Sequence, residues 1–560
     1  MSLTTDQRSQ LLRDIRANVL QESTQANFRG TNNAKLPDTT KVQQQIAYLS
    51  RLNPSAASYT TGFTLSFHGV VNVGKLEDAL AEVVSRHDAL RTRFFWQEGE
   101  LKREVFQSLD VRLNVESSVN IDIDAEAYAS RAFDIAEAPL WKAVLLHDEN
   151  SGREVLVWTA SHSIFDGFSM NLVAEELAAL YQGFSVAPVK HQMSDLPQFE
   201  HEIVGSDELQ KLLAYWKSVV KPQKAMSLAD LKNDVQSMQS AFTIHEPLPN
   251  ELLSEVDTYA RSRRTTRSAV LLSAYIAVLH RLSGDKEITV GVPLDGRYKS
   301  KLRGVVGNLV NTLPVQVTIG SPMSFNQLVD NASSLLTQTI EHQALPLSML
   351  IDELSPTRDG LSPPLFSTIF NFTGLPEANG FDFGPDLKAS LAGLSNSSSR
   401  FDYELSIDST ADGVRVRFEY DKEKVSTARA KLIVSAFSLG LNIFVQDSDT
   451  PIADIPQQLL CRLSPNGASP HIANKGATQH SESTAEIMRT IEPIWRKTLG
   501  SDCDIDKNFF ASGGTSLAAV PMTNEISESI GVEVPLVDVL TADSLSEVAE
   551  IITSLKNDIQ

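Results

Sequence analysis

A histidine and an aspartate stand four residues apart in the run SHSIFDG, which covers residues 161–167. His162 is the type of side chain most readily poised near neutral pH to accept a proton from an attacking amine or hydroxyl. The apolar run 154–159 precedes it, and an amphipathic helix over 170–181 is predicted to follow. Packing on both sides would hold His162 and Asp166 rigidly, as proton transfer requires. The pattern predicts acid–base chemistry, although a DG pair also fits a plain structural turn.

A serine follows paired glycines in the run GGTSL, residues 513–517. Glycines adopt backbone angles that other residues avoid, so we expect Ser516 to open a helix that runs to about Ile530. The N–H groups and the positive dipole end of a helix N-terminus suit a phosphate ester. A plain helix cap would also place a serine there. A nucleotide loop is disfavoured because no lysine follows and no strand precedes.

Composition excludes several classes of protein. The 560 residues carry a net charge of −21, which disfavours nucleic acid and anionic membranes as partners. Cys461 and Cys503 form neither a CxxC pair nor a metal-ligand spacing, so we expect no disulfide framework and no metal site. The first twenty residues lack the continuous apolar stretch of a signal peptide, and no run elsewhere approaches about 18 apolar residues. A cytoplasmic protein without a membrane span is predicted.

The elements that must position these residues fall into a large and a small domain. Residues 1–36 are a polar lead-in, after which strand-like and helical runs alternate and predict an α/β body. A body of this size exceeds a single core, so we expect an N-terminal lobe over 37–205 and a C-terminal lobe over 206–460. Residues 461–482 are rich in Pro, Gly, Ser and Asn, which predicts a flexible linker.

The small domain, residues 483–557, is predicted to be acidic and helical. Ser483 with Glu486, and Ser544 with Glu547, have the spacing of capping boxes that open helices. Between them lies DxxFFxxGGxSL, and this order of elements resembles the carrier (thiolation) domain of nonribosomal peptide synthetases. The resemblance implies a four-helix carrier that bears covalent 4′-phosphopantetheine on Ser516.

The large domain carries five further runs that occur in a familiar order. They are SRHDALRTRF at 85–94, GVPLDGR at 291–297, VVGNLVNTL at 305–313, EHQALPLSML at 341–350 and SPPLFSTIFNF at 362–372. Together with SHSIFDG they resemble the condensation domain of nonribosomal peptide synthetases, over about 38–458. The resemblance implies two chloramphenicol-acetyltransferase-like lobes that face one another in a V shape, an α/β (α+β) fold.

The resemblance also implies roles for single residues. The family signature HHxxxDG falls on His162, Asp166 and Gly167. His162 would orient or deprotonate the acceptor nucleophile, and Asp166 would be structural and pair with Arg297. The Gly167 N–H would face the developing oxyanion, and Asn371 is a candidate for lining the cleft. The family activity is acyl transfer that forms amide or ester bonds from phosphopantetheine thioesters.

Two groups of residues extend this interpretation. Arg86, His87 and Arg91 are predicted to hold the fold rather than to react. Ser161 replaces the first histidine of the signature, and SHxxxDxxS, completed by Ser169, resembles product-releasing, cyclising condensation domains of fungi. Both serines are therefore candidates for the substrate cleft.

The order of domains implies partners. A condensation domain followed directly by a carrier resembles pairs found in fungal siderophore synthetases, and no adenylation domain lies between the two. Ser516 would then be charged by an adenylation domain in trans or in another module, after a phosphopantetheinyl transferase has modified it. An upstream donor carrier would supply the second substrate, and the chain would be a piece of a larger synthetase.

Two alternatives remain open beside a condensation–carrier enzyme and its cyclising variant. The first is a coenzyme A-dependent acyltransferase of the same superfamily, which the run FDFGPDL at 381–387 partly supports. The second is a non-catalytic docking or gating module in which Ser161 marks a decayed site. An epimerase is disfavoured because its glutamate motif is missing, and a heterocyclising domain would need aspartate at His162.

Overall fold

The structure is a computed structural model. It describes residues 38–54, 57–221, 241–354, 365–372, 380–394, 401–410, 413–449, 451–454, 482–500, 516–532 and 544–559, with 226, 228, 503–505, 507, 509, 512, 534, 539 and 542. The lead-in predicted at 1–36 and the linker predicted at 461–482, apart from Glu482, lie outside the described residues.

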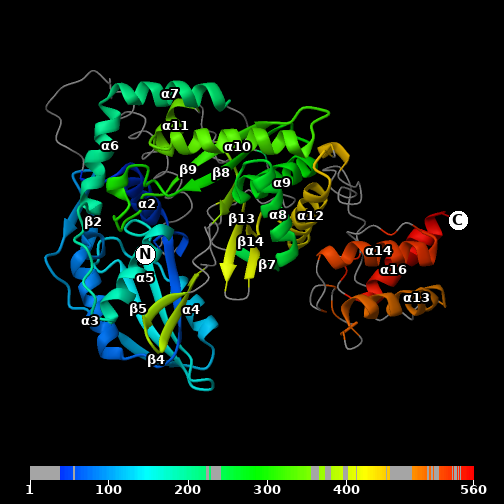
Figure 1. Cartoon of the computed structure of the whole chain (residues 1–560), viewed down its shortest axis with the longest axis horizontal. Coiled ribbons are helices and arrows are strands. Elements are labelled where there is room, and N and C mark those ends of the chain that lie inside the picture. The colour runs from blue at the N-terminus through cyan, green and yellow to red at the C-terminus, as the bar shows by residue number, and fades with distance from the viewer. Residues whose placement is uncertain are drawn as a thin grey trace, which may run out of the picture.

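The first lobe is built on a six-stranded sheet with the order β11-β12-β1-β6-β5-β4. In its central strand β1, apolar side chains alternate with polar ones, so that Phe63, Leu65 and Phe67 are buried in the core. Helices α3 and α5 cover this sheet (Figure 1). The strands are β1 Thr60–His68, β4 Asn114–Ser118, β5 Trp141–Asp148, β6 Glu154–Ser161, β11 Phe381–Gly384 and β12 Leu387–Gly393. The other elements are α2 Lys41–Leu52, α3 Val73–Arg86, α4 Ile121–Ala129, α5 Gly167–Tyr181 and a hairpin of β2 Thr92–Gln97 and β3 Glu100–Val105.

The second lobe has its own six-stranded sheet, with the order β7-β14-β13-β10-β8-β9. Its core is formed mainly against α9, which is buried along nearly its whole length. The strands are β7 Ala241–Pro247, β8 Glu287–Leu294, β9 Asn311–Thr318, β10 Thr368–Phe372, β13 Tyr403–Thr410 and β14 Gly413–Asp421. The helices are α7 Asp207–Val219, α8 Asn250–Ser262, α9 Arg267–Ser283, α10 Phe325–Glu341, α11 Leu347–Leu354 and α12 Thr427–Gln446. Helix α6 Leu196–Val204 lies between the lobes, with Leu196 and Phe199 in the core of the first lobe and Ile203 packed with residues of the second. The predicted α/β body with two lobes is confirmed.

The two lobes are not consecutive in the sequence. The β11–β12 hairpin falls inside the predicted C-terminal lobe, yet β12 pairs antiparallel with β1, for example Leu65 with Leu391. The hairpin therefore belongs to the first sheet, although its sequence lies between two strands of the second sheet. The predicted division at 205/206 is accordingly incomplete, because one cut cannot separate the lobes.

The small domain follows as a helical unit. Its described helices are α13 Glu482–Leu499, α14 Ser516–Ile530 and α16 Leu545–Ile559, which pack around the buried Trp495. The prediction that Ser516 opens a helix ending at Ile530 is confirmed. The Ser544 hydroxyl accepts the N–H of Glu547 at 3.3 Å, as the capping spacing predicts. Helix α13 begins at Glu482, one residue before the start that the Ser483 spacing predicts.

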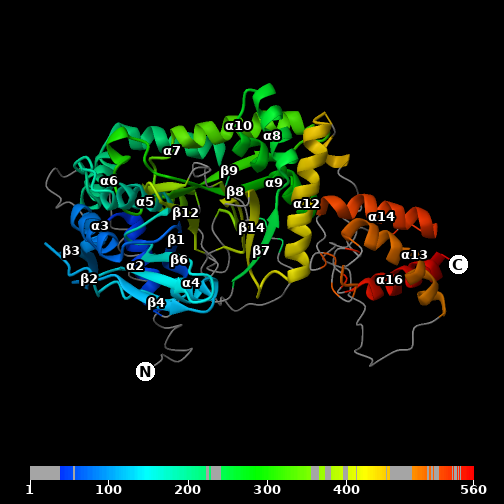
Figure 2. The same cartoon turned by 60° about the horizontal axis from the view of Figure 1, so that its bottom comes forward.

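The small domain lies beside the second lobe. Helix α14 contacts α12, and both views show the small domain beyond α12, on the side away from the β6–α5 turn of the first lobe (Figures 1 and 2). Helix α12 is itself long and apolar enough to cross a membrane by length and composition, with a mean hydropathy of 1.4 in its most apolar stretch. Most of that stretch is buried against the rest of the protein, as in a core helix.

Candidate active site

The turn between β6 and α5 is held by packing on both sides. β6 is buried from Val155 to Ser161, and α5 buries Val173 and Leu177 completely. Asp166 is the N-cap residue of α5, and its Oδ1 accepts the N–H of Ser169 at 2.8 Å. Such a cap fixes where the helix starts, and so it fixes the end of the turn that carries His162.

The imidazole of His162 is oriented by its own turn. Nδ1 lies 2.6 Å from the carbonyl oxygen of Phe165, which can only accept a hydrogen bond. Nδ1 therefore carries the proton in the neutral ring, and the lone pair lies on Nε2. His162 is partly exposed as a residue, so the turn holds a proton acceptor at a position that is not sealed from solvent.

Asp166 and Arg297 form a buried ion pair. The guanidinium donates from Nη1 to Oδ2 at 2.9 Å and from Nη2 to Oδ1 at 3.1 Å, and both side chains are 0% exposed. The backbone N–H of Leu309 also donates to Oδ2, at 3.0 Å. The pair joins α5 of the first lobe to the loop after β8 of the second. The structure thus brings together two residues that the sequence analysis pairs.

The ionisation of Asp166 follows from these contacts. Burial by itself would raise the pKa of Asp166, but the charge of Arg297 and its hydrogen bonds outweigh burial. With the N–H groups of Leu309 and Ser169, they lower the pKa of Asp166 below its usual value. The carboxylate is therefore charged and fully engaged, which suits a structural role and leaves proton transfer to another group.

Gly167 is exposed at the first position of α5. A Cβ atom added there would meet nothing within 4 Å, so space is open in front of this residue. The first N–H groups of a helix have no partner within the helix and are available to an acceptor outside it. This position is compatible with the predicted contact to an oxyanion.

Two predicted cleft residues do not reach a cleft. Ser169 is 0% exposed, and its hydroxyl donates to Asp166 Oδ1 at 2.8 Å and lies 3.0 Å from the carbonyl oxygen of Gly307. Ser161 is 3% exposed, and its Oγ lies 2.8 Å from Oγ of Ser163. Both predictions are wrong, because these hydroxyls are buried and satisfied inside the turn.

Asn371 lies in β10 of the second sheet. Its amide donates to Glu404 Oε1 at 3.4 Å, and none of the hydrogen bonds described joins it to the turn of His162. Its role in the cleft stays a prediction.

Sequence reasoning missed a contact that crosses between the lobes. Asn308, 4% exposed, donates from Nδ2 to the carbonyl oxygen of His162 at 2.6 Å. Asn308 lies in the run VVGNLVNTL, whose resemblance to the family assigns no role to a single residue. An amide that contacts a main-chain atom 146 residues away leaves no local pattern.

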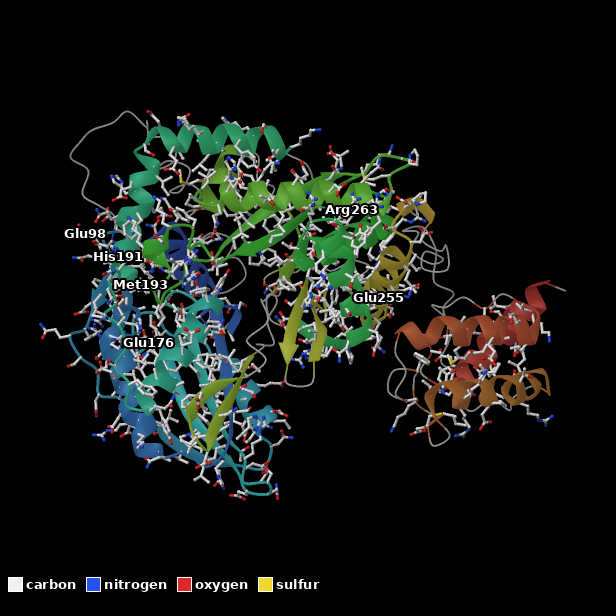
Figure 3. The ribbon with its side chains drawn as sticks, in the orientation of Figure 1. Glu98, Glu176, His191, Met193, Glu255 and Arg263 are labelled. Carbon is white, nitrogen blue, oxygen red and sulfur yellow. The ribbon has the colours of Figure 1, made fainter. Side chains whose placement is uncertain are left out.

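The residues predicted to hold the fold do so. Arg86 and His87 both contact Glu176 of α5, with Nε of Arg86 at 2.9 Å and Nε2 of His87 at 3.0 Å. Figure 3 labels Glu176 in the first lobe. Arg91 donates from Nε to the carbonyl oxygen of Val84 at 3.1 Å. The two contacts with Glu176 fasten the end of α3 to α5, the helix that follows His162, and the Arg91 bond holds the next segment against α3.

The position of Ser516 in the small domain suits the attachment of a phosphopantetheine group. Ser516 is the first residue of α14, where helix N–H groups favour a phosphate ester. No group of three or more His, Cys, Asp or Glu side chains could hold a metal ion within the part of the chain that the structure describes.

Two family patterns match the chain. The pattern described as "Condensation domain" matches residues 36–457, and "Phosphopantetheine attachment site" matches residues 489–552. Among curated relatives, surfactin synthase subunit 1 of Bacillus subtilis is 26% identical over 418 residues, which are 74% of this chain and 12% of that protein. Bacitracin synthase 3 of Bacillus licheniformis is 26% identical over 444 residues, 78% of this chain and 7% of that protein. The chain thus matches an eighth or less of these relatives.

Solved structures show the same fold. The first condensation domain of the calcium-dependent antibiotic synthetase, in complex with a substrate analogue, superimposes with a TM-score of 0.65 at 22% identity, over 75% of this chain and 99% of that one. A mutant starter condensation domain of rhizomide synthetase, in complex with C8-CoA, gives 0.66 at 20% identity, over 75% and 97%. The X-domain from teicoplanin biosynthesis gives 0.64 at 18% identity, over 76% and 98%.

Condensation domains are enzymes that form amide bonds between carrier-bound thioesters, and attachment-site domains carry covalent 4′-phosphopantetheine on a serine. The chain therefore belongs to the condensation-domain family of nonribosomal peptide synthetases and continues into a phosphopantetheine-bearing carrier domain.

Proposed function

We propose that this chain forms an amide or ester bond between two carrier-bound acyl or peptidyl thioesters, with His162 as the group that orients or deprotonates the acceptor nucleophile. The observation that carries the proposal is the bond from Nδ1 to the carbonyl oxygen of Phe165. It leaves the lone pair of the neutral ring on Nε2, at a partly exposed position. A fixed tautomer at a rigid turn is the arrangement that general base catalysis requires.

The remaining residues of the turn support this chemistry. Nε2 of His162 accepts the proton as the amine or hydroxyl attacks the carbonyl carbon, and the N–H of Gly167 donates to the carbonyl oxygen as negative charge develops there. A well-placed donor of this kind is worth about 3 kcal/mol in the transition state. Asp166 and Arg297 hold the turn and stay charged throughout. When bound at Ser516, phosphopantetheine supplies the thioester linkage that activates or presents the substrate.

The proposal includes the partners of the reaction. A phosphopantetheinyl transferase modifies Ser516, an adenylation domain in trans or in another module charges it, and an upstream carrier brings the donor. The two family matches end and begin at residues 457 and 489, an interval too short for an adenylation domain, which supports charging from elsewhere. A cytoplasmic location is part of this proposal and fits a chain whose described cysteine, Cys503, is a free thiol.

The finer assignment is a condensation–carrier pair of a fungal siderophore synthetase. Its support is the direct succession of the two domains. The product-releasing, cyclising alternative rests on Ser161 and Ser169, but these hydroxyls hold the turn from inside. The cyclising alternative therefore has weaker support than the siderophore-type assignment.

Two structural relatives favour second candidates. The rhizomide starter domain was solved with C8-CoA, so coenzyme A thioesters are candidate donors in place of a carrier. The teicoplanin X-domain was solved in complex with OxyB, which makes a docking role without catalysis the other candidate.

The deciding experiment uses the holo protein, charged at Ser516 from a panel of aminoacyl-coenzyme A compounds by a phosphopantetheinyl transferase. An acyl-loaded carrier is added as donor, and products are read by intact mass. We expect His162→Ala to lower turnover by at least about 100-fold. His280→Ala is the matched control, since Nδ1 of His280 also lies 2.6 Å from a backbone carbonyl, that of Asp285, and it should leave turnover unchanged.

Each competing function has its own outcome. If Ser516→Ala no longer gains the mass of the phosphopantetheine group, Ser516 is identified as the attachment serine. Turnover with acyl-coenzyme A, undiminished in Ser516→Ala, would replace the proposal by the coenzyme A-dependent acyltransferase. Product formation that His162→Ala leaves unchanged would favour the docking module.

A further inference from the structure

The main chain and the ring of His162 are held from three directions. Its N–H donates to the carbonyl oxygen of Tyr59 at 2.6 Å, and Nδ1 donates to that of Phe165 at 2.6 Å. Both partners belong to the first lobe. The third bond, from Nδ2 of Asn308 to the carbonyl oxygen of His162, comes from the second lobe.

The orientation of the Asn308 amide is determined by its surroundings. The N–H of Val310 donates to Oδ1 at 3.2 Å, so the oxygen faces Val310 and the NH2 group faces His162. Asn308 is 4% exposed, so water does not compete for either bond. A buried carbonyl that loses its donor retains the full cost of leaving water.

The neighbours of Asn308 bind the same turn. Leu309 N–H donates to Asp166 Oδ2 at 3.0 Å, and Gly307 N–H donates to Ser169 Oγ at 3.1 Å. Three consecutive residues of the second lobe thus contact the turn and the first turn of α5. Asn308 is the one of the three whose bond ends on the histidine itself.

We propose that Asn308 is a positioning residue, which fixes the main chain of His162 to the second lobe and so sets where Nε2 lies relative to the reacting carbonyl. This inference rests on the proposed role of His162 as the base. Asn308 acts through its bond to the carbonyl of His162. A displacement of a catalytic group by about 1 Å costs up to about 100-fold in rate.

Two substitutions remove the bond in different ways. Asn308→Asp keeps an acceptor for Val310 N–H but, when ionised, has no proton to donate to His162. Asn308→Ala removes both contacts and is the second variant should the first fold poorly. In both variants we expect kcat to fall about 10- to 100-fold, while KM for the donor carrier stays within about twofold of the parental value.

The matched control is Asn311→Asp. Asn311 is also buried, 9% exposed, and its Nδ2 donates to the carbonyl oxygens of Gln343 and Leu345 at 2.9 and 2.7 Å. It holds the fold without a described bond to His162. We expect a lower melting temperature in Asn311→Asp with kcat of the folded protein nearly unchanged. An equal loss of kcat in this control would overturn the inference.

A pH series separates positioning from general damage. The carboxyl of Asn308→Asp would lie among His162, Asp166 and Arg297, and once protonated it can donate to the His162 carbonyl. The ratio of its kcat to the parental kcat should therefore rise as pH falls. The ratio for Asn308→Ala should stay flat, because alanine has no proton to regain. A flat ratio in both variants contradicts the inference.

A spectroscopic readout does not depend on turnover. In holo protein with 15N-labelled histidine, the ring nitrogen signals of His162, assigned with His162→Ala, should shift in Asn308→Asp and Asn308→Ala but not in Asn311→Asp. Unmoved signals would overturn the inference even if His162 proves catalytic. Conversely, shifted signals with a fully active His162→Ala would keep the positioning and refute the proposed function.

Discussion

The carboxylate of Asp166 receives donors on both of its oxygens, from Arg297, Ser169 and Leu309, and no part of it is exposed. A pair of this kind is costly to break, because the remaining charge is left buried without its partner. The residue therefore acts on the reaction only through the geometry of the turn.

We expect Asp166→Asn to lower the free energy of unfolding of the condensation domain by about 3–5 kcal/mol, since it leaves the Arg297 charge uncompensated. Urea denaturation at pH 7 measures this. Glu104→Gln is the control, because Glu104 and Arg93 are 45% and 39% exposed and such surface pairs contribute at most about 1 kcal/mol. Similar losses in the two variants would contradict the buried pair.

The same pair predicts a pH dependence. The pKa of Asp166 is lower in the folded protein than in the unfolded chain, where it is about 3.9. Its contribution is therefore complete above about pH 4 and disappears as pH falls through the lower, folded value. The stability difference between the parent and Asp166→Asn should shrink in acid. A difference that widens in acid would contradict the lowered pKa.

The residues of the site were predictable to different degrees. His162, Asp166, Gly167 and Arg297 belong to short runs with a recognisable pattern. Ser161 and Ser169 were predicted to line a cleft because a motif names residues but not their burial. Whether a hydroxyl faces substrate or the inside of a turn is decided by packing against distant segments.

At the scale of elements, one glycine allows the loop after β8 to approach the segment before β9. Gly296 has φ +67, and a Cβ atom on it would lie 1.8 Å from the carbonyl oxygen of Leu309. This close approach brings Arg297 and Leu309 to the same carboxylate.

We expect Gly296→Ala to destabilise the condensation domain by at least about 1–3 kcal/mol, because alanine is strained at this backbone angle and clashes with Leu309. Gly304→Ala is the matched control in the same connection, since a Cβ there meets nothing within 4 Å. It should change the free energy of unfolding by less than about 0.5 kcal/mol. Urea denaturation compares the two, and equal effects would speak against the close approach.

Local periodicity predicted the elements that flank the site. The strand expected at 154–159 is β6, and the helix expected at 170–181 is α5, which begins three residues earlier at Gly167. The additional turn comes from the N-cap at Asp166, whose partner Arg297 is distant in sequence. Helix starts depend on such caps, which hydrophobic patterns do not reveal.

At the scale of the whole molecule, the first sheet is completed by the hairpin of β11 and β12. Periodicity could not predict this, since pairing between strands hundreds of residues apart leaves no trace in either strand. A fragment of residues 38–205 should therefore aggregate, because it exposes the edge of β1. Size-exclusion chromatography measures this, with a fragment of residues 36–457 run as the reference. A monomeric fragment with a cooperative thermal transition would contradict the role of the hairpin.

The hairpin also bears on the construction of chimeric assembly lines. Grafting the first lobe of this catalytic unit onto another synthetase requires two additional crossover points, around residues 380 and 394. Only then does the borrowed lobe bring β11 and β12, the two strands that complete its sheet. A hybrid joined at a single breakpoint would instead inherit a seam between strands that never evolved together.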